Sequence, residues 1–463
     1  MYIYNTMSRR KELLVPLKEG KISMYACGPT VYNFFHIGNA RPFIVFDTLR
    51  RYLEYRGYQV TFVQNFTDID DKMIRRANEE GITVKELGDR FIQEYYKDAD
   101  ALGVKRATVN PRATDHIQDI IDLVKTLVEK GHAYPTPNGD VYFSVRSWPG
   151  YGKLSGQNID DLENGARVDP TEEKQDPLDF ALWKGQKPGE PAWPSPWGMG
   201  RPGWHIECSA MARKHLGKTI DIHAGGQDLQ FPHHENEIAQ SEAATGKPFA
   251  HYWMHNGFIN VDNQKMSKSL GNFFTVRDIA KEYDLDVVRL FMLSVQYRNP
   301  INFSRDLIQQ AAAALQRLHT ALDRLKEAPV ASEPAADEQV FVDTLEGYRT
   351  RFNEAMDDDL NTADALGVLF DLARAANTFV SVPRTRKAID AVTALYTELM
   401  DVLGLLPRKT GEEFPAEVLS LLDERQAARK AKNYARADEI REQLKALGYA
   451  IEDSRQGAKL KKL

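Results

Sequence analysis

The first part of the chain alternates strand-like and helix-like segments. Residues 22–27 form a short apolar run that stops at a Gly-Pro pair, which predicts a strand. Apolar side chains recur at helical spacing within 41–55, and they are Val45, Phe46, Leu49 and Leu53. Residues 58–66 are rich in β-branched and aromatic side chains, so a second strand is expected there. This order predicts a βαβ unit with a right-handed crossover and a parallel sheet.

The pattern changes near residue 115. Apolar positions at helical spacing predict a helix within 117–128, and a strand is expected at 140–145. From 148 to 204 the chain is rich in Pro, Gly and Trp, which indicates an insertion with irregular loops. Strand-like residues return at 219–223, where we expect the parallel sheet to resume.

After Asn302 the pattern becomes wholly helical. Ser304 is a suitable N-cap for a helix with a narrow apolar stripe, made of Leu307, Ala311, Ala314, Leu318, Ala321 and Leu325. A Pro/Ala/Glu linker at 328–336 follows. Three more amphipathic helices are expected, near 341–356, 362–380 and 388–403. These segments predict a helical bundle.

A second break, at 407–415, introduces a small tail that we expect to be helical. One face of its second helix would carry Ala437, Ile440, Leu444 and Leu447. The whole chain has a net charge of −6, yet the tail from Arg425 onward holds eleven Lys/Arg against five Asp/Glu. Such a basic end indicates contact with a phosphate backbone, and a solvated helical face is the alternative. Tyr434 and Tyr449 are its candidates for stacking on bases.

The predicted fold class is therefore α/β, with a helical bundle and a small domain after it. A Rossmann-like catalytic domain is expected in two halves, 1–114 and 201–302, separated by an inserted domain at 115–200. The bundle is expected at 303–406 and the small basic domain at 407–463. Ligands bind at the carboxyl ends of parallel strands, which places Cys27 at the rim of a site.

Composition narrows the class of protein. Apolar content of 42% and charged content of 27% in 463 residues are ordinary for a globular protein of several domains. The N-terminus lacks the features of a signal peptide, and no apolar stretch is long enough to span a bilayer. We therefore expect a cytoplasmic protein with no membrane partner. The two cysteines, Cys27 and Cys208, exclude a disulfide framework and sit among Gly, His and Glu, which favours metal binding or catalysis.

Two short motifs are suited to binding phosphates. His36-Ile37-Gly38-Asn39 lies between the first strand and the first helix, where backbone amides attract phosphate and an imidazole can stabilise phosphoryl charge. Residues 265–269 read KMSKS, and their lysines Lys265 and Lys268 suit a clamp on a polyphosphate. This pair resembles the HIGH and KMSKS signatures of class I aminoacyl-tRNA synthetases. The fourth position of the first motif is Asn39, where HIGH has a His. Asparagine keeps a hydrogen-bond donor but has no titratable ring, so we expect Asn39 only to position a ligand.

A second group of residues suits a metal. Cys208 lies within 203–209, and 231–237 offers imidazole and carboxylate ligands. His233 and Glu237 are four residues apart, so on a helix they point the same way. With Cys27 they make a borderline-soft divalent site, for which zinc is the natural occupant.

The chain closely resembles the cysteinyl-tRNA synthetases over nearly its whole length. The matching stretches are YACGPTVY at 25–32, TDIDDK at 67–72, WPSPWG at 193–198, and 203–209, 231–240 and 265–277. The resemblance implies one zinc ion per chain, held by Cys27, Cys208, His233 and Glu237. It also implies that the protein is a monomer and that it binds ATP with Mg²⁺, L-cysteine and tRNA(Cys). Zinc would bind the cysteine thiolate in preference to a serine hydroxyl, so no editing domain is needed.

The same resemblance implies roles for individual residues. His36, Asn39, Lys265 and Lys268 would be catalytic. ATP would be bound by these four residues together with Gly38 and Asp228, the last of which orients ribose. The substrate cysteine would contact Trp204, Cys27 and Thr67.

Two other readings are open at this point. A paralogue that joins cysteine to an amino-sugar would share the catalytic half, but it would not need a tRNA-binding tail. A zinc-stabilised module that binds RNA or a protein would be non-enzymatic, and it would have no use for both phosphate-handling motifs.

Overall fold

The computed structural model describes residues 1–158, 173–265, 274–408, 415–431, 433–454 and 457–462. The chain divides into two compact units, Met1–Leu406 and Pro407–Leu463, which are considered separately. No helix among the described residues is both long enough and apolar enough to cross a membrane.

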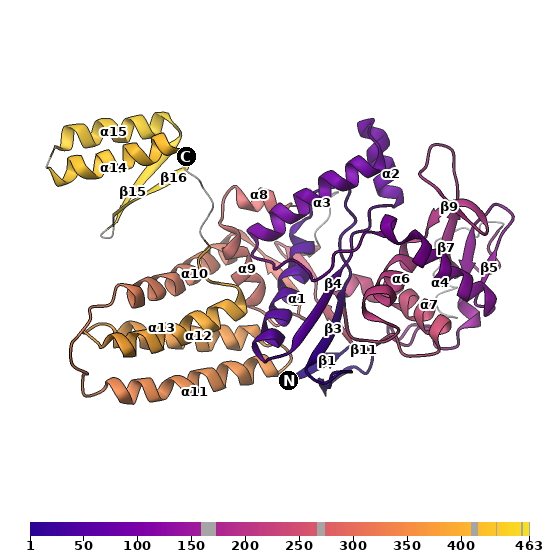
Figure 1. Ribbon diagram of the computed structural model, residues 1–463, viewed down its shortest axis with the longest axis horizontal. Helices are drawn as coiled ribbons and strands as arrows, with labels where there is room; N and C mark the ends of the chain where they lie inside the picture. Colours follow the sequence, from indigo (N-terminus) through magenta and orange to yellow (C-terminus); the bar gives the residue numbers. More distant parts are fainter. Residues whose placement is uncertain (159–172, 266–273, 409–414, 432, 455–456, 463) are drawn as a thin grey trace. The chain divides into compact units, whose positions relative to one another are not determined.

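A parallel sheet forms the centre of the first unit (Figure 1). Its strands are β3 (Lys21–Ala26), β4 (Gln59–Gln64), β10 (Ile220–Gly226) and β11 (Ala250–Asn256). They lie in the order β11-β10-β3-β4, and every neighbouring pair is parallel. The prediction of an α/β fold with a parallel sheet is thus confirmed. A hairpin of β1 (Tyr2–Asn5) and β2 (Arg10–Leu13) precedes the sheet.

Helices pack on both faces of this sheet. Ile22 and Met24 of β3 join a core that includes α1 (Ile37–Tyr55), whereas Tyr25 joins a core with α6 (Trp204–Leu216) and α7 (Glu235–Thr245). This alternation follows from the two-residue period of a strand. The apolar stripe predicted for α1 is buried throughout, so that prediction is confirmed.

Several elements around the sheet were not predicted from the pattern. They are α2 (Asp71–Glu80), α3 (Val84–Ala101), a short turn at Ala113–His116, α8 (Val276–Ala280), α9 (Leu285–Leu293), and the strands β12 (Ile259–Val261), β13 (Gln264–Lys265) and β14 (Ile301–Phe303). β12 pairs with both β13 and β14 in a small three-stranded sheet.

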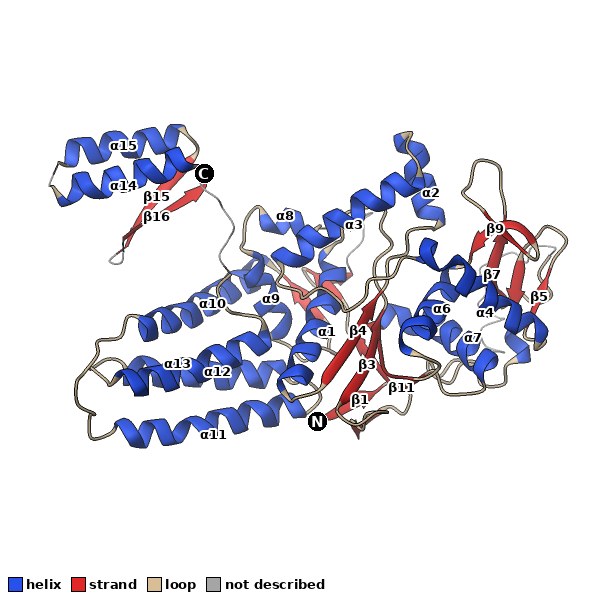
Figure 2. Ribbon diagram, viewed as in Figure 1, coloured by secondary structure: helices blue, strands red, loops and turns tan. Residues whose placement is uncertain are grey.

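The inserted region contains a sheet of its own (Figure 2). After α4 (Ile117–Glu129), five antiparallel strands lie in the order β5-β6-β7-β9-β8. They are β5 (Ala133–Pro135), β6 (Val141–Phe143), β7 (Phe180–Gly185), β8 (Trp193–Ser195) and β9 (Gly198–Pro202). The expectation of irregular loops from 148 to 204 is therefore wrong for 180–202. Gly200 of β9 fits because a Cβ there would lie 2.3 Å from Trp183 Nε1.

Four helices form the bundle: α10 (Arg305–Lys326), α11 (Glu338–Asp357), α12 (Thr362–Phe379) and α13 (Arg386–Leu403). The Ser304 side chain accepts a hydrogen bond from the Leu307 amide, so the predicted N-cap is confirmed. The buried face of α10 is shifted from the predicted stripe. Leu307 is 38% exposed, while Ile308 and Leu315 are buried and share the helical face of Leu318 and Leu325.

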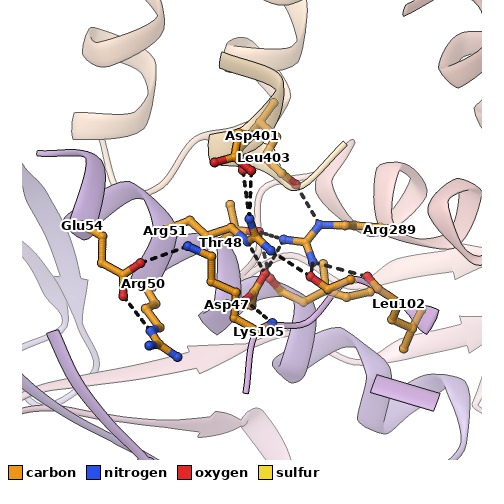
Figure 3. Close-up of polar contacts among 12 residues, drawn as sticks. Asp47, Thr48, Arg50, Arg51, Glu54, Leu102, Lys105, Arg289, Asp401 and Leu403 are labelled. Carbon is orange, nitrogen blue, oxygen red and sulfur yellow. Dashed lines mark hydrogen bonds and ion pairs between the residues drawn. The ribbon is translucent and has the colours of Figure 1, made fainter. Parts of the chain in front are cut away.

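A buried polar cluster joins the bundle to α1 (Figure 3). Asp47 of α1 accepts hydrogen bonds from Arg51 Nε (2.8 Å), Arg289 Nη2 (2.5 Å) and the Lys105 amide (2.8 Å). Arg289 also donates to the carbonyl of Leu403 at the end of α13 (2.7 Å). The cluster therefore ties the helix that begins at the first signature to the last helix of the bundle.

The second unit combines two helices with a hairpin. The helices are α14 (Ala416–Lys430) and α15 (Tyr434–Ala446), and the hairpin pairs β15 (Tyr449–Ser454) with β16 (Gly457–Lys462). The expectation of a purely helical tail is therefore wrong. Ala437, Ile440 and Leu444 are buried as predicted, but Leu447 is 44% exposed. Tyr449 is buried against Ile440 and Leu444, so the fold does not leave its ring available for stacking.

Candidate active site

The candidate site lies at the carboxyl edge of the parallel sheet. Cys27 directly follows β3, and Asn65 directly follows β4. The chain leaves β3 toward β4 on one side, whereas β10 and β11 lie on the other, so the crevice between β3 and β10 is the switch point of this sheet. Open parallel sheets bind ligands at such a point because the loops diverge there.

The four predicted metal ligands meet at this edge. Cys208 comes from the first turns of α6, Glu237 from α7, and His233 from the irregular turn at Gln230–His234 just before α7. Their ligand atoms and Cys27 Sγ all lie within 4.8 Å of one another. Glu237 Oε1 is 3.0 Å from His233 Nε2 and 3.5 Å from Cys27 Sγ. Two thiols, an imidazole and a carboxylate are a donor set that fits zinc.

Further histidines surround this group, and none of them is among the four predicted ligands. His223 of β10 contacts Glu237 Oε2 through its Nε2 at 2.8 Å, and His234 Nε2 lies 3.3 Å from Cys27 Sγ. These two histidines, with Cys27 and Glu237, form a second, overlapping set of potential ligands. Outside them, His205 Nδ1 is 2.9 Å from His233 Nδ1, and His255 Nε2 is 2.8 Å from His234 Nδ1. Their proximity arises from packing of separate elements.

Burial and mutual contacts set the charges in this cluster. The hydrogen bond from Cys27 lowers the pKa of Cys208 to about 6, whereas burial raises the pKa of Cys27. Burial would also raise the pKa of Glu237, but His223 and His233 outweigh it and bring that pKa to about 2. Burial acts to lower the pKa of His233, but the Glu237 carboxylate prevails and raises it to about 10. These shifts favour the thiolate of Cys208 and the carboxylate of Glu237, and they keep a proton on His233, which a bound dication would have to displace.

The residues predicted to contact the substrate cysteine line this edge. Trp204 is the first residue of α6 and is 41% exposed, and its ring lies 4.4 Å from the His233 ring. Thr67 is buried and donates a hydrogen bond to Glu207 Oε2 at 2.9 Å. Asn65 Nδ2 also donates to Thr67 Oγ1 at 3.4 Å, while Asn65 Oδ1 accepts from the Gly28 amide. The loops after β3 and β4 and the start of α6 are therefore linked by hydrogen bonds.

The structure describes most, but not all, of the predicted ATP-binding residues. His36 is the N-cap of α1, with Gly38 and Asn39 in its first turn, where the positive end of the helix dipole attracts phosphate. Asp228 is exposed in the short turn Gln227–Leu229 after β10. The backbone of Lys265 pairs in β13, opposite Asn260. Lys268 lies outside the described residues.

Comparison with known protein families accounts for most of the chain. The model of the tRNA synthetases class I (C) catalytic domain matches residues 13–313. The DALR domain matches residues 351–407, and the cysteinyl-tRNA ligase anticodon binding domain matches residues 411–459.

Solved structures share the fold at low identity. Methionyl-tRNA synthetase of Mycobacterium tuberculosis, in complex with methionyl-adenylate, is 16% identical with a TM-score of 0.59, over 83% of this chain and 90% of that one. The agnB2 LeuRS of Agrobacterium radiobacter, in a ternary complex with tRNA, is 11% identical with a TM-score of 0.59, over 85% and 84%. A putative arginyl-tRNA synthetase of Campylobacter jejuni is 13% identical with a TM-score of 0.52, over 83% and 91%.

Proposed function

The chain belongs to the cysteinyl-tRNA synthetase family of class I enzymes, which attach cysteine to its tRNA, and we propose that it selects cysteine through a zinc ion. The ligands in this proposal are Cys27, Cys208, His233 and Glu237. The observation that carries it is the convergence of these four side chains at the switch point of the sheet, with all ligand atoms within 4.8 Å.

The chemistry of this donor set supports zinc. A zinc ion there would supply a Lewis acid that binds the substrate thiol as thiolate, whereas the hydroxyl of serine would stay protonated and bind weakly. A plain pocket rejects such a near isostere poorly. The low pKa values of Cys208 and Glu237 give the cluster two anionic donors for a dication. Of the two overlapping sets, this one has two thiols, which is the softer environment.

The reaction has two steps. The cysteine carboxylate attacks the α-phosphorus of ATP and pyrophosphate leaves, and a ribose hydroxyl at the 3′ end of tRNA then takes the cysteinyl group and releases AMP. In our proposal His36 and the α1 amides stabilise charge on the transferring phosphoryl group. Lys265 and Lys268 hold the outer phosphates together with Mg²⁺, and Asp228 orients the ribose. Asn39 and Gly38 position the nucleotide at the helix start.

Two sequence-level alternatives lose their support. The amino-sugar ligase reading needs no anticodon domain, but the anticodon binding domain of the cysteinyl-tRNA ligases matches residues 411–459. The purely binding module is excluded by the match to a catalytic domain over 13–313. We further propose that the enzyme works as a cytoplasmic monomer.

A ligand substitution tests the zinc proposal. The purified protein is expected to contain one zinc ion per chain. Cys208→Ser should lose zinc more readily and raise KM for cysteine in pyrophosphate exchange, because a hydroxyl is a weak zinc ligand. Metal analysis and exchange kinetics on the same samples check this. Full zinc content together with normal exchange kinetics in that variant would refute the proposal.

A further inference from the structure

The segment just after the second signature lies against the first signature. The Ile37 amide donates to the Phe274 carbonyl at 3.1 Å, and the Val276 amide donates to the Phe35 carbonyl at 3.3 Å. His36 and Thr275 form an antiparallel bridge between these two bonds. Residues more than 200 positions apart are thus joined by their backbones directly at the predicted ATP-binding residue His36.

A single side chain of α8 reinforces this contact. Arg277 Nε donates to Asp98 Oδ1 of α3 at 2.7 Å, and Arg277 Nη2 pairs with the Glu94 carboxylate. The guanidinium also lies over the Phe34 ring, 4.1 Å from its centroid. The Phe34 ring packs edge-on against Phe91 of α3 at 5.3 Å. Arg277 therefore contacts both the loop that ends at His36 and the helix beneath that loop.

The loop needs such support because it has little structure of its own. Between the end of β3 at Ala26 and the start of α1 at Ile37, the chain forms no helix and no named strand. Its placement is set by neighbours, and Arg277 is suited to the task. A planar guanidinium can stack on an aromatic face while its edge pairs with carboxylates, and a lysine cannot do both equally well.

We propose that Arg277 is a positioning residue for adenylate formation. It fixes residues 274–278 on α3 and on the Phe34–His36 loop, and so holds the start of α1 and the segment that follows the second signature in one arrangement. The inference rests on the proposed function of His36 and of the second signature in ATP binding. Displacement of reacting groups by about 1 Å can cost about 100-fold in rate, so the clamp would act mainly on kcat.

The test is cysteine-dependent pyrophosphate exchange by the full chain. Arg277→Ala should lower kcat by about 10- to 100-fold, with KM for cysteine unchanged. Arg277→Lys keeps the ion pairs without the planar stack, and it should recover part of kcat. Phe34→Leu removes the stack alone and should show an intermediate loss.

Lys281→Ala is the matched control. Lys281 belongs to the same region and makes an exposed ion pair with Asp278 (2.9 Å), and it contacts neither α3 nor the first signature in the described structure. Its kcat should equal that of the wild type. Thermal unfolding is recorded for every variant, and kcat at 25 °C is compared among folded samples.

The outcomes separate this inference from the function on which it rests. A folded Arg277→Ala enzyme with wild-type kcat would overturn the positioning role and leave the proposed function standing. A loss of kcat that Arg277→Lys fails to relieve, with Phe34→Leu at wild-type activity, would also overturn it. Absence of cysteine-dependent exchange in the wild type would instead refute the proposed function.

Discussion

The buried cluster around Asp47 allows a quantitative prediction. Asp47 is 1% exposed and accepts hydrogen bonds from Arg289 and Arg51, whose side chains are 0% and 11% exposed. Asp47→Asn keeps the shape but leaves two guanidinium groups with no buried counter-charge. Breaking a buried ion pair from one side costs about 3–5 kcal/mol. We therefore expect the free energy of unfolding at pH 7 to fall by about 3–5 kcal/mol.

Tryptophan fluorescence during urea unfolding measures this loss. The six tryptophans all lie between Trp148 and Trp253, so the signal reports on the unit Met1–Leu406 alone. Burial opposes ionisation of Asp47, but Arg289 and Arg51 prevail and lower its pKa in the folded state. That stabilisation is fully present above the unfolded pKa of about 3.9 and is lost as the pH falls further. The difference between wild type and variant should narrow in acid accordingly.

Asp401→Ala is the control for this prediction. Asp401 pairs with the same Arg51 at 3.3 Å, but it is 61% exposed. Exposed pairs contribute at most about 1 kcal/mol because water screens the charges. Adding Arg289→Met to Asp47→Asn should also recover stability, since one of the unpaired buried cations is then gone. If Asp47→Asn proved no more costly than Asp401→Ala, the reasoning about buried charge would be refuted.

Two further predictions concern function. Lys268→Ala should slow adenylate formation strongly in single-turnover assays while cysteine binding stays nearly intact, because its charge acts on the polyphosphate during the reaction. Weaker cysteine binding with unchanged adenylate formation would contradict this role. Truncation at Arg408 should leave pyrophosphate exchange largely intact, because Met1–Leu406 is a compact unit, while tRNA charging falls and the salt dependence of tRNA binding becomes shallower. If the truncated chain charged tRNA as well as the full chain, the tail would be only a solvated cap with no role in tRNA binding.

The parts of the fold that the sequence predicts correctly are those with strong apolar periodicity. Helices cover both faces of β3 and β4, so most residues of these strands are apolar and buried, and the apolar stripe of α1 packs on one of the two faces. The strand expected at 140–145 is β6 of the inserted sheet, but β7, β8 and β9 were missed because they use Pro and Gly for local reasons. Pro194 lies on the edge strand β8, where a missing amide costs little, and Gly200 allows the Trp183 ring to approach. Neither reason can be read from the sequence alone.

The candidate site, too, could be predicted only in part from the sequence. Cysteine, histidine and glutamate at separate places were sufficient to predict a donor set, because few other uses need those residue types together. His223 was read only as part of a strand, since a single histidine in a buried strand is more often a core residue. Its contact with Glu237 depends on the approach of β10 to α7, which is a tertiary distance. The charge state of each ring depends on the same packing, so it also follows only from the structure.

Glu237 is held by two of the histidines at this edge of the sheet, His223 and His233. Its Oε2 is occupied by His223, which leaves Oε1 to face His233 and Cys27. The carboxylate is fully buried, and a buried anion persists only where partners compensate its charge. His223 thus orients Glu237 by hydrogen bonding one oxygen, as outer partners of metal ligands commonly do. In the proposed mechanism, selection of a thiol over a hydroxyl therefore depends on the four proposed ligands and also on the imidazole that fixes the direction of one of them.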